Sequence, residues 1–210
     1  MCESVFKVLV IGDSSVGKTA MVARYCHNRW LAQYKVTLGA DYAVKTLTWK
    51  DREAVRLHMW DLAGQDHFRQ MSRTYFRGAS GCVVMFDVTN RQTFENVAVW
   101  KADLDSKVVL PSGRPIPCIL AANKDDEQNQ CVPSHELSKF AKEQGFFSFV
   151  FMSVKENRNV TEMMTQLVEQ MLSVEESLGM VQQAEDVSTR LIRIENSKKS
   201  SDSESCVCAR

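Results

Sequence analysis

Short apolar runs recur along the chain and alternate with segments whose apolar positions lie three or four residues apart. The runs at residues 5–11, 81–88, 116–122 and 147–152 are dominated by branched and aromatic side chains, as expected of strands buried in a parallel sheet. The segments between them have the spacing of amphipathic helices that cover such a sheet. This alternation predicts an α/β fold.

The helical spacing is present in four segments. The first opens at residues 20–25, the second spans 94–108 and the last covers 160–171. The remaining one begins at Pro133, a residue favoured at a helix start, and ends at Gly145, which is favoured at a helix end.

Two β-rich segments follow a polar, weakly periodic stretch at residues 30–42, which predicts a loop. Residues 42–50 and 53–60 are joined by a turn at 50–52. A connection this short makes the pair antiparallel, because parallel neighbours need a long crossover. The sequence therefore predicts a six-stranded, mostly parallel sheet with one antiparallel strand, flanked by helices.

Composition narrows the class of protein. The chain has 210 residues, 44% hydrophobic and 25% charged, which suits one globular domain with an appendage. Its formal net charge is +0, so no overall field favours nucleic acid as a partner. Seven cysteines without zinc-ligand spacing favour a reduced, cytosolic protein. The shift to Ser, Glu, Gln and Lys beyond about residue 174 predicts a folded domain over 1–174 and a flexible tail over 175–210.

The first candidate site directly follows the first predicted strand. Residues 12–19, Gly-Asp-Ser-Ser-Val-Gly-Lys-Thr, fit the phosphate-binding pattern G-x-x-x-x-G-K-[ST], called the P-loop below. Glycines let the backbone wrap an anion, and its N–H groups form a nest at the positive end of the next helix. Lys18 would reach the β- and γ-phosphates, and the Thr19 hydroxyl would bind Mg²⁺. The alternative, a glycine turn with a surface lysine, does not account for the strand in front.

A second motif, D-x-x-G, ends the second strand of the predicted hairpin. Asp61 would hold the metal through a water, and the Gly64 amide could approach the γ-phosphate. Gln65 can donate and accept hydrogen bonds together, so it could orient a water for attack. Alone this motif is often an ordinary turn, but its position after a P-loop favours a nucleotide site.

A third motif, N-K-x-D at residues 123–126, predicts the base. The Asp126 carboxylate would accept hydrogen bonds from the N1–H and 2-amino groups of guanine, which adenine lacks. By analogy with other hydrogen-bonding sites, the loss of such bonds costs about 10⁴–10⁵ in selectivity. Asn123 and Lys124 would brace the loops and cover the ring, and residues 153–155 could close over the base with backbone amides. A helix-capping Asn is the alternative interpretation of the motif.

Together these motifs resemble those of the P-loop NTPases with a Ras-like G domain, and the Rab family of small GTPases most closely, over about residues 5–173. The stretches that carry this resemblance are 34–42, 60–68 and 75–79. Residues 100–107, the Leu110-Pro111 loop and 153–157 are similar to the Rab subgroup of lysosome-related organelles, late endosomes and the trans-Golgi.

The resemblance implies individual roles. Thr37 would bind Mg²⁺ through its hydroxyl and the γ-phosphate through its amide. Trp30 would either lie against guanine or serve packing alone. Tyr42, Trp60 and Tyr75 would present the nucleotide state to effectors. The implied catalytic set is Gln65, Lys18 and Thr37, and the metal set is Thr19, Thr37 and Asp61. The implied nucleotide contacts are Ser14, Ser15, Val16, Gly17, Lys18, Thr19, Ala20, Trp30, Tyr34, Thr37, Gly64, Asn123, Lys124, Asp126, Ser153, Val154 and Lys155.

Some residues depart from the family pattern. Ala20 and Val36 replace serines, Leu62 stands for Thr or Ile, and Asp66-His67 stands for Glu-Arg. The last pair affects recognition by regulators more than the chemistry, whereas Ala20 keeps the backbone N–H that phosphate binding needs.

The C-terminus ends in a C-x-C pair, Cys206 and Cys208, without a C-a-a-X box. After a flexible tail this pair looks like the doubly geranylgeranylated end of a Rab, since two lipid chains give the stable attachment that one does not. The alternative is a pair of unmodified thiols.

The function implied is a switch that cycles between GDP and GTP, hydrolyses GTP slowly and regulates vesicle traffic. Its partners would be an exchange factor, a GTPase-activating protein, an escort or GDP-dissociation inhibitor, and effectors. We expect a monomer on the cytoplasmic face of endomembranes that cycles with the cytosol. The alternatives are a nucleotide-dependent scaffold without useful hydrolysis and a P-loop kinase of small metabolites, although a kinase has no use for N-K-x-D.

Overall fold

The computed structural model describes residues 3–31, 35–49, 52–64 and 72–179. Met1–Met171 form one compact unit and Leu172–Arg210 a second, in which residues 172–179 are helical. Within the described ranges, no helix has both the length and the apolar character that crossing a bilayer requires.

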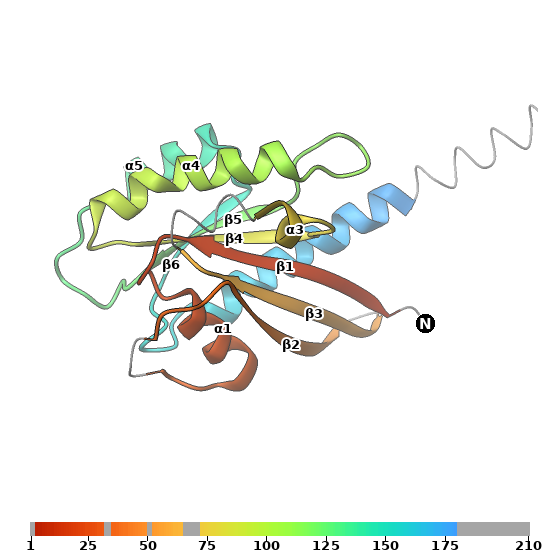
Figure 1. Cartoon of the computed structure of the whole chain (residues 1–210), viewed down its shortest axis with the longest axis horizontal. Helices are drawn as coiled ribbons and strands as arrows, with labels where there is room; N and C mark the ends of the chain where they lie inside the picture. The colour runs from red at the N-terminus through yellow and green to blue at the C-terminus, as the bar shows by residue number, and fades with distance from the viewer. Residues whose placement is uncertain (1–2, 32–34, 50–51, 65–71, 180–210) are drawn as a thin grey trace, which may run out of the picture. The chain divides into compact units, whose positions relative to one another are not determined.

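A six-stranded sheet in the order β2-β3-β1-β4-β5-β6 is the centre of the first unit (Figure 1). The strands are β1 (Ser4–Gly12), β2 (Ala40–Trp49), β3 (Arg52–Leu62), β4 (Gly81–Asp87), β5 (Cys118–Asn123) and β6 (Ser148–Met152). β2 pairs antiparallel with β3, and the other four pairs of neighbours are parallel. The predicted fold class is therefore confirmed. Because five strands run the same way, their carboxyl ends lie along one edge of the sheet.

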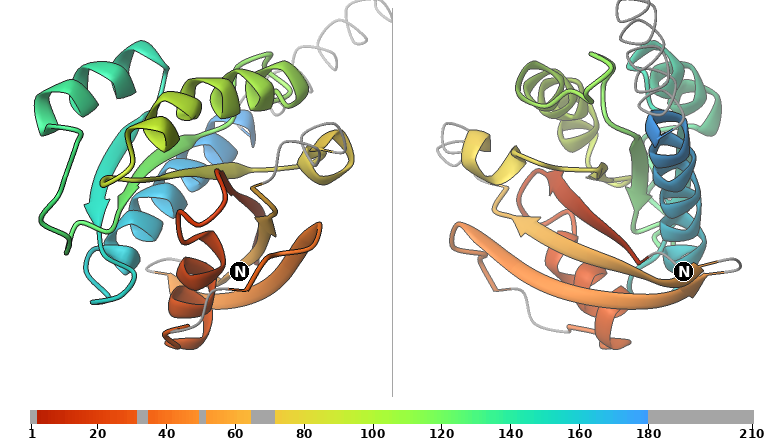
Figure 2. Two further views of the ribbon diagram at one scale, coloured as in Figure 1. Left: turned by 60° about the vertical axis from the view of Figure 1, so that its left-hand side comes forward. Right: turned by 90° about the vertical axis from the view of Figure 1, so that its right-hand side faces the viewer.

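Helices cover both faces of the sheet (Figure 2). They are α1 (Lys18–His27), α3 (Ser72–Phe76), α4 (Arg91–Lys107), α5 (Ser134–Glu143) and a helix that begins at residue 160. On the face of α4 and α5, alternate strand residues such as Leu9, Val84 and Leu120 join Trp100 and Leu137 in one buried cluster. The opposite face is covered by α1 and by residues 160–171.

Some details of these elements differ from the sequence-based expectations. β3 extends to Leu62, so Asp61 lies within the strand and pairs with Val10 of β1. β5 begins at Cys118 and not at residue 116, because Pro117 has no N–H to donate to a strand ladder. The short helix α3 was not predicted. The predicted turn at residues 50–52 falls largely outside the described residues.

Candidate functional site

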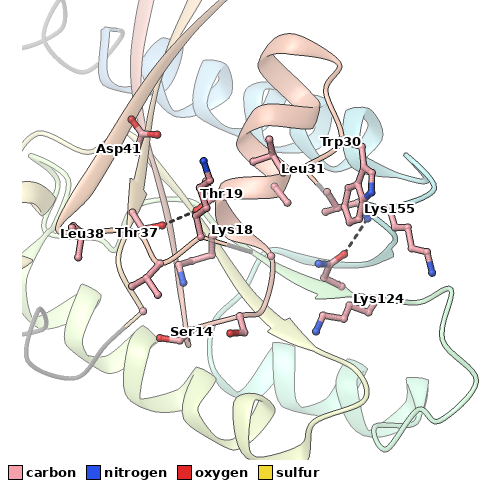
Figure 3. Close-up of a pocket in the computed structure, with 18 of the residues that line it drawn as sticks. Ser14, Lys18, Thr19, Trp30, Leu31, Thr37, Leu38, Asp41, Lys124 and Lys155 are labelled. Carbon is pink, nitrogen blue, oxygen red and sulfur yellow. Dashed lines mark hydrogen bonds between the residues drawn. The ribbon is translucent and has the colours of Figure 1, made fainter. Parts of the chain in front are cut away.

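A cavity of about 1100 Å³ opens at the edge where the parallel strands end. The loops after β1, β3, β5 and β6 contribute to its wall, together with the segment that precedes β2. Lys18, Thr19 and Thr37 lie at one end of it, and Trp30, Lys124 and Lys155 lie at the other (Figure 3). The fold thus gathers the three sequence motifs around one space.

The P-loop takes a shape that needs glycine at two positions. Gly12 and Gly17 have φ values of 138° and 101°, in the left-handed range that other residues avoid. A Cβ on Gly12 would lie 2.1 Å from the Met85 carbonyl oxygen, and one on Gly17 would lie 2.5 Å from Asn123 Nδ2. Close packing against β4 and β5 therefore fixes the path of the loop.

Lys18 lies in the first turn of α1 with its ammonium turned back to the loop. Its Nζ donates to the carbonyl oxygens of Gly12 and Asp13, at 2.9 and 2.7 Å. Burial lowers the pKa of Lys18 to about 8, against the opposing charges of Asp61 and Asp13. The side chain is thus a desolvated cation that the loop itself orients, as binding of phosphate oxygens requires.

Three oxygen-bearing side chains meet beside Lys18. The hydroxyl oxygens of Thr19 and Thr37 lie 2.9 Å apart, and the Thr19 hydroxyl donates to Asp61 Oδ2. Asp61 is 1% exposed. Burial raises the pKa of Asp61 to about 6, although the hydrogen bond from Thr19 and the charge of Lys18 act in the opposite direction.

This cluster fits a small divalent cation. Among the described residues, Asp61 Oδ1 is a buried oxygen without a hydrogen-bond partner. Such an oxygen is costly to bury and is satisfied by a cation or by the water that a cation holds. Two hydroxyls and a carboxylate are hard oxygen donors of the kind that Mg²⁺ prefers.

At the other end of the cavity, Asn123 ties two loops together. Its Nδ2 donates to the Val16 carbonyl at 2.8 Å, and the Val154 amide donates to its Oδ1 at 3.1 Å. The Lys124 ammonium pairs with Asp87 at the end of β4. These contacts agree with the bracing that the N-K-x-D motif led us to expect.

Asp126 presents a largely buried carboxylate to the cavity. Its side chain is 5% exposed, and Lys155 Nζ lies 3.4 Å from Oδ2. Burial acts to raise the pKa of Asp126, but hydrogen bonds from Ser153 and Lys155 hold this pKa below its ordinary value. The group is therefore an ionised acceptor near neutral pH.

Not every predicted contact residue lines the cavity. Val16 and Ser153 are fully buried and are not part of its wall. The Val16 carbonyl accepts from Asn123, and the Ser153 hydroxyl accepts from the Glu156 amide at 3.0 Å. Tyr34 and Gln65 lie outside the described residues. The predicted residues that do line it are Ser14, Ser15, Gly17, Lys18, Thr19, Ala20, Trp30, Thr37, Gly64, Asn123, Lys124, Asp126, Val154 and Lys155.

Arg24 was missed by the sequence analysis. It projects from α1 and donates to the carbonyl oxygens of Val154 and Lys155, each at 3.2 Å. Its guanidinium carbon also lies 5.9 Å from the ring centroid of Trp30. No motif marks this residue, because its partners are about 130 positions away along the chain.

The three predicted effector-facing aromatics form a continuous row that runs from β2 through β3 to α3. Tyr42 and Trp60 are cross-strand partners with ring centroids 5.3 Å apart, and Trp60 and Tyr75 are 6.3 Å apart. The row is extended by His58, whose Nδ1 lies 2.5 Å from the Tyr42 hydroxyl, and by Lys7, 4.6 Å above the Trp60 ring.

A P-loop, an oxygen cluster suited to a cation and an N-K-x-D segment, all on a mostly parallel six-stranded sheet, define a Ras-like nucleotide-binding domain. The Ras family model matches residues 7–173. The chain belongs to the Ras family, and its curated relatives assign it to the Rab GTPases within that family.

Three relatives represent this similarity. The chain is 52% identical over 171 residues to Ras-related protein Rab-7L1 of Rattus norvegicus, covering 81% of this chain and 84% of that protein. It is 46% identical over 177 residues to Ras-related protein Rab-32 of Mus musculus, covering 83% and 79%. It is 38% identical over 204 residues to Ras-related protein Rab-32B of Dictyostelium discoideum, covering 97% and 78%.

Membership of this family establishes the general activity. The chain is a small GTPase that binds guanine nucleotide, hydrolyses GTP and regulates membrane traffic in association with endomembranes. Its partners include regulators of the nucleotide cycle and effectors. The scaffold and kinase alternatives are not favoured.

Proposed function

We propose that this Rab GTPase has a magnesium-dependent cycle of GTP binding and hydrolysis, in which one end of the cavity binds the phosphates and the other end binds the base. The observation that carries the proposal is the cluster of Thr19, Thr37 and Asp61 beside the Lys18 ammonium. Phosphates fit this end of the cavity, and guanine fits the end that contains Asp126.

At the phosphate end, Lys18 binds β- and γ-phosphate oxygens, and the backbone of residues 14–20 donates N–H groups to them. Thr19 and Thr37 hold Mg²⁺ through their hydroxyls, and Asp61 holds it through a water. The bound metal supplies stabilisation of the negative charge on the transferring phosphoryl group. The amides of Thr37 and Gly64 approach the γ-phosphate, so its loss releases both segments.

Gln65, which lies outside the described residues, orients the attacking water. No arginine is among the described residues that line the cavity. Intrinsic hydrolysis is therefore slow, on the order of 10⁻⁴ s⁻¹ as for Ras without its activator, and an activating protein supplies the missing charge.

At the base end, Asp126 accepts the N1–H and 2-amino groups of guanine and exchanges its contact with Lys155 for them. Asn123 and Lys124 hold the loop, the amides of residues 153–155 close over the base, and Trp30 covers it. Tyr42, Trp60 and Tyr75 present the nucleotide state to effectors.

Single-turnover hydrolysis tests this assignment. Wild-type protein loaded with GTP hydrolyses it only when Mg²⁺ is present, and Gln65→Leu slows the step at least tenfold without weakening GTP binding. Gln128→Leu, which changes an exposed glutamine, leaves the rate unchanged. Binding of GTP that is indifferent to Mg²⁺, or equal rates in Gln65→Leu and wild type, would contradict the proposal.

The tail completes the proposal. The GTP-binding domain spans residues 1–174, and residues 175–210 form a tail that carries geranylgeranyl groups on Cys206 and Cys208. The protein is a monomer that cycles between the cytosol and the cytoplasmic face of late endosomes, lysosome-related organelles or the trans-Golgi. The family membership and the C-x-C pair support this. Mass spectrometry of the membrane fraction tests it, because unmodified Cys206 and Cys208 there would refute the anchor.

A further inference from the structure

Asp13, the second residue of the P-loop, is held from outside the loop by α4. Its Oδ1 accepts the indole N–H of Trp100 at 2.7 Å, and its Oδ2 accepts the side-chain amide of Asn96 at 2.6 Å. The two donors are one helical turn apart, so they lie on the same side of α4. The motif itself requires no particular residue type at this position.

The hydrogen bond between Trp100 and Asp13 satisfies a buried donor. Trp100 is 3% exposed, and an indole N–H that is buried without an acceptor would cost free energy. The acceptor here is a carboxylate, which makes the hydrogen bond stronger and shorter than a neutral one. The main chain of Asp13 is held as well, since its carbonyl oxygen accepts from Lys18 Nζ.

The main chain that this carboxylate anchors is also the surface on which Gly64 rests. A Cβ on Gly64 would lie 2.4 Å from the Asp13 carbonyl carbon and 2.4 Å from the Ser14 nitrogen. Any displacement of residues 13 and 14 would therefore change how closely Gly64 can approach the P-loop. Gly64 is the residue whose amide approaches the γ-phosphate in the function proposed above.

We propose that Trp100 and Asn96 are positioning residues that act through Asp13. The three side chains, called the α4 clamp here, set the spacing between the P-loop and Gly64 that GTP requires and GDP does not. The inference rests on the proposed function of Gly64. The clamp thus controls discrimination between the two nucleotides and the rate of hydrolysis, in addition to the packing of α4.

Nucleotide release distinguishes this role from packing alone. Trp100→Phe keeps an aromatic side chain and removes the N–H, and Asn96→Ala removes the second donor from a half-buried position. Each variant is expected to raise the rate of GTP release about tenfold while GDP release changes less than twofold. Trp49→Phe, at the far end of β2, is the matched control.

A double-mutant cycle tests whether the side chains act as a unit. Asp13→Ala and Trp100→Phe should be non-additive in the ratio of GTP to GDP release rates, because each removes the same hydrogen bond. Additive effects, or equal acceleration of GTP and GDP release in proportion to a fall in melting temperature, would overturn the proposal and leave a packing role. Failure of the proposed function would give a different result, because wild-type protein itself would then bind GTP without needing Mg²⁺.

A spectroscopic signal provides a readout that packing would not move. The chain has four tryptophans, and the indole N–H resonance of Trp100 is the one missing from Trp100→Phe. In ¹⁵N-labelled protein this resonance is expected to shift between the GDP form and the form with a non-hydrolysable GTP analogue, and to move upfield in Asp13→Asn. A resonance indifferent to both changes would contradict the clamp.

Discussion

The hydroxyl oxygens of Thr19 and Thr37 lie 2.9 Å apart, although the residues are eighteen positions apart in the chain. Thr19 is fixed in the first turn of α1, whereas Thr37 belongs to the segment that precedes β2. Their meeting beside the Asp61 carboxylate creates a site of oxygen ligands. A cation that binds there connects the two segments.

Removal of the Thr37 hydroxyl should uncouple the segment that precedes β2 from α1. Thr37→Ala is expected to lower the Mg²⁺ dependence of GTP binding and to slow hydrolysis at least tenfold, with little effect on GDP, because this ligand is needed in the GTP form. Fluorescent-nucleotide titrations at several Mg²⁺ concentrations measure this. Thr37→Ser keeps the hydroxyl and should retain the dependence, and Thr46→Ala, on the exposed side of β2, should behave as wild type. Equal Mg²⁺ dependence in Thr37→Ala and wild type would exclude the ligand role.

Base selectivity should follow the carboxylate of Asp126. Asp126→Asn replaces one acceptor with an N–H donor that faces the guanine 2-amino group, so GTP affinity is expected to fall at least a hundredfold. Xanthine carries an oxygen at that position, so affinity for xanthosine triphosphate should rise. Competition binding measures both.

The neighbouring Asp125→Asn is the matched control. Asp125 pairs with Arg158 at 2.8 Å and does not line the cavity. Asp125→Asn should leave base selectivity unchanged. A similar fall in GTP affinity in both variants would count against the assignment of Asp126.

The lowered pKa of Lys18 predicts that GTP binding is linked to a proton. Burial lowers the pKa of Lys18 to about 8 in the protein without nucleotide. Bound phosphates stabilise the ammonium and raise this pKa. Below pH 8 the side chain is already protonated, whereas above pH 8 binding must take up a proton. Affinity should therefore fall as pH rises through 8, by up to about tenfold per pH unit.

Calorimetry on nucleotide-stripped protein in two buffers of different ionisation enthalpy measures this uptake. We expect almost no proton at pH 7 and nearly one at pH 9, and none at either pH in Lys18→Gln. The absence of uptake at pH 9 in the wild-type protein would show that Lys18 stays charged without phosphate.

Arg24 should govern nucleotide release without distinguishing GTP from GDP. Arg24→Met keeps the aliphatic stem but loses the bonds to the Val154 and Lys155 carbonyls, worth about 1 kcal/mol together at this partly exposed position. Release of both nucleotides is expected to accelerate roughly fivefold, since the base loop is common to both states. Arg29→Met, which changes an exposed neighbour, is the control. Stopped-flow measurements in which Arg24→Met accelerates the release of GTP but not of GDP would contradict this role.

Much of the fold could be predicted because its determinants are local. Buried parallel strands need continuous apolar runs, and the helices between them need apolar side chains at a fixed spacing. The site motifs are local for the same reason, since a tight anion-binding turn needs Gly12 and Gly17 at set positions. Where a local rule was applied loosely, as for the start of β5 near Pro117, the boundary was misplaced.

The sequence by itself thus determined the sheet, its one antiparallel pair and the three loops that hold chemistry. Only the tertiary structure decided that Trp100 donates to Asp13 across 87 positions, and that Arg24 holds a loop far along the chain. It also decided that the side chains of Val16 and Ser153 are buried and do not line the cavity. The physical reason is that hydrogen bonds between distant side chains depend on the orientation of packed helices, which no local spacing encodes.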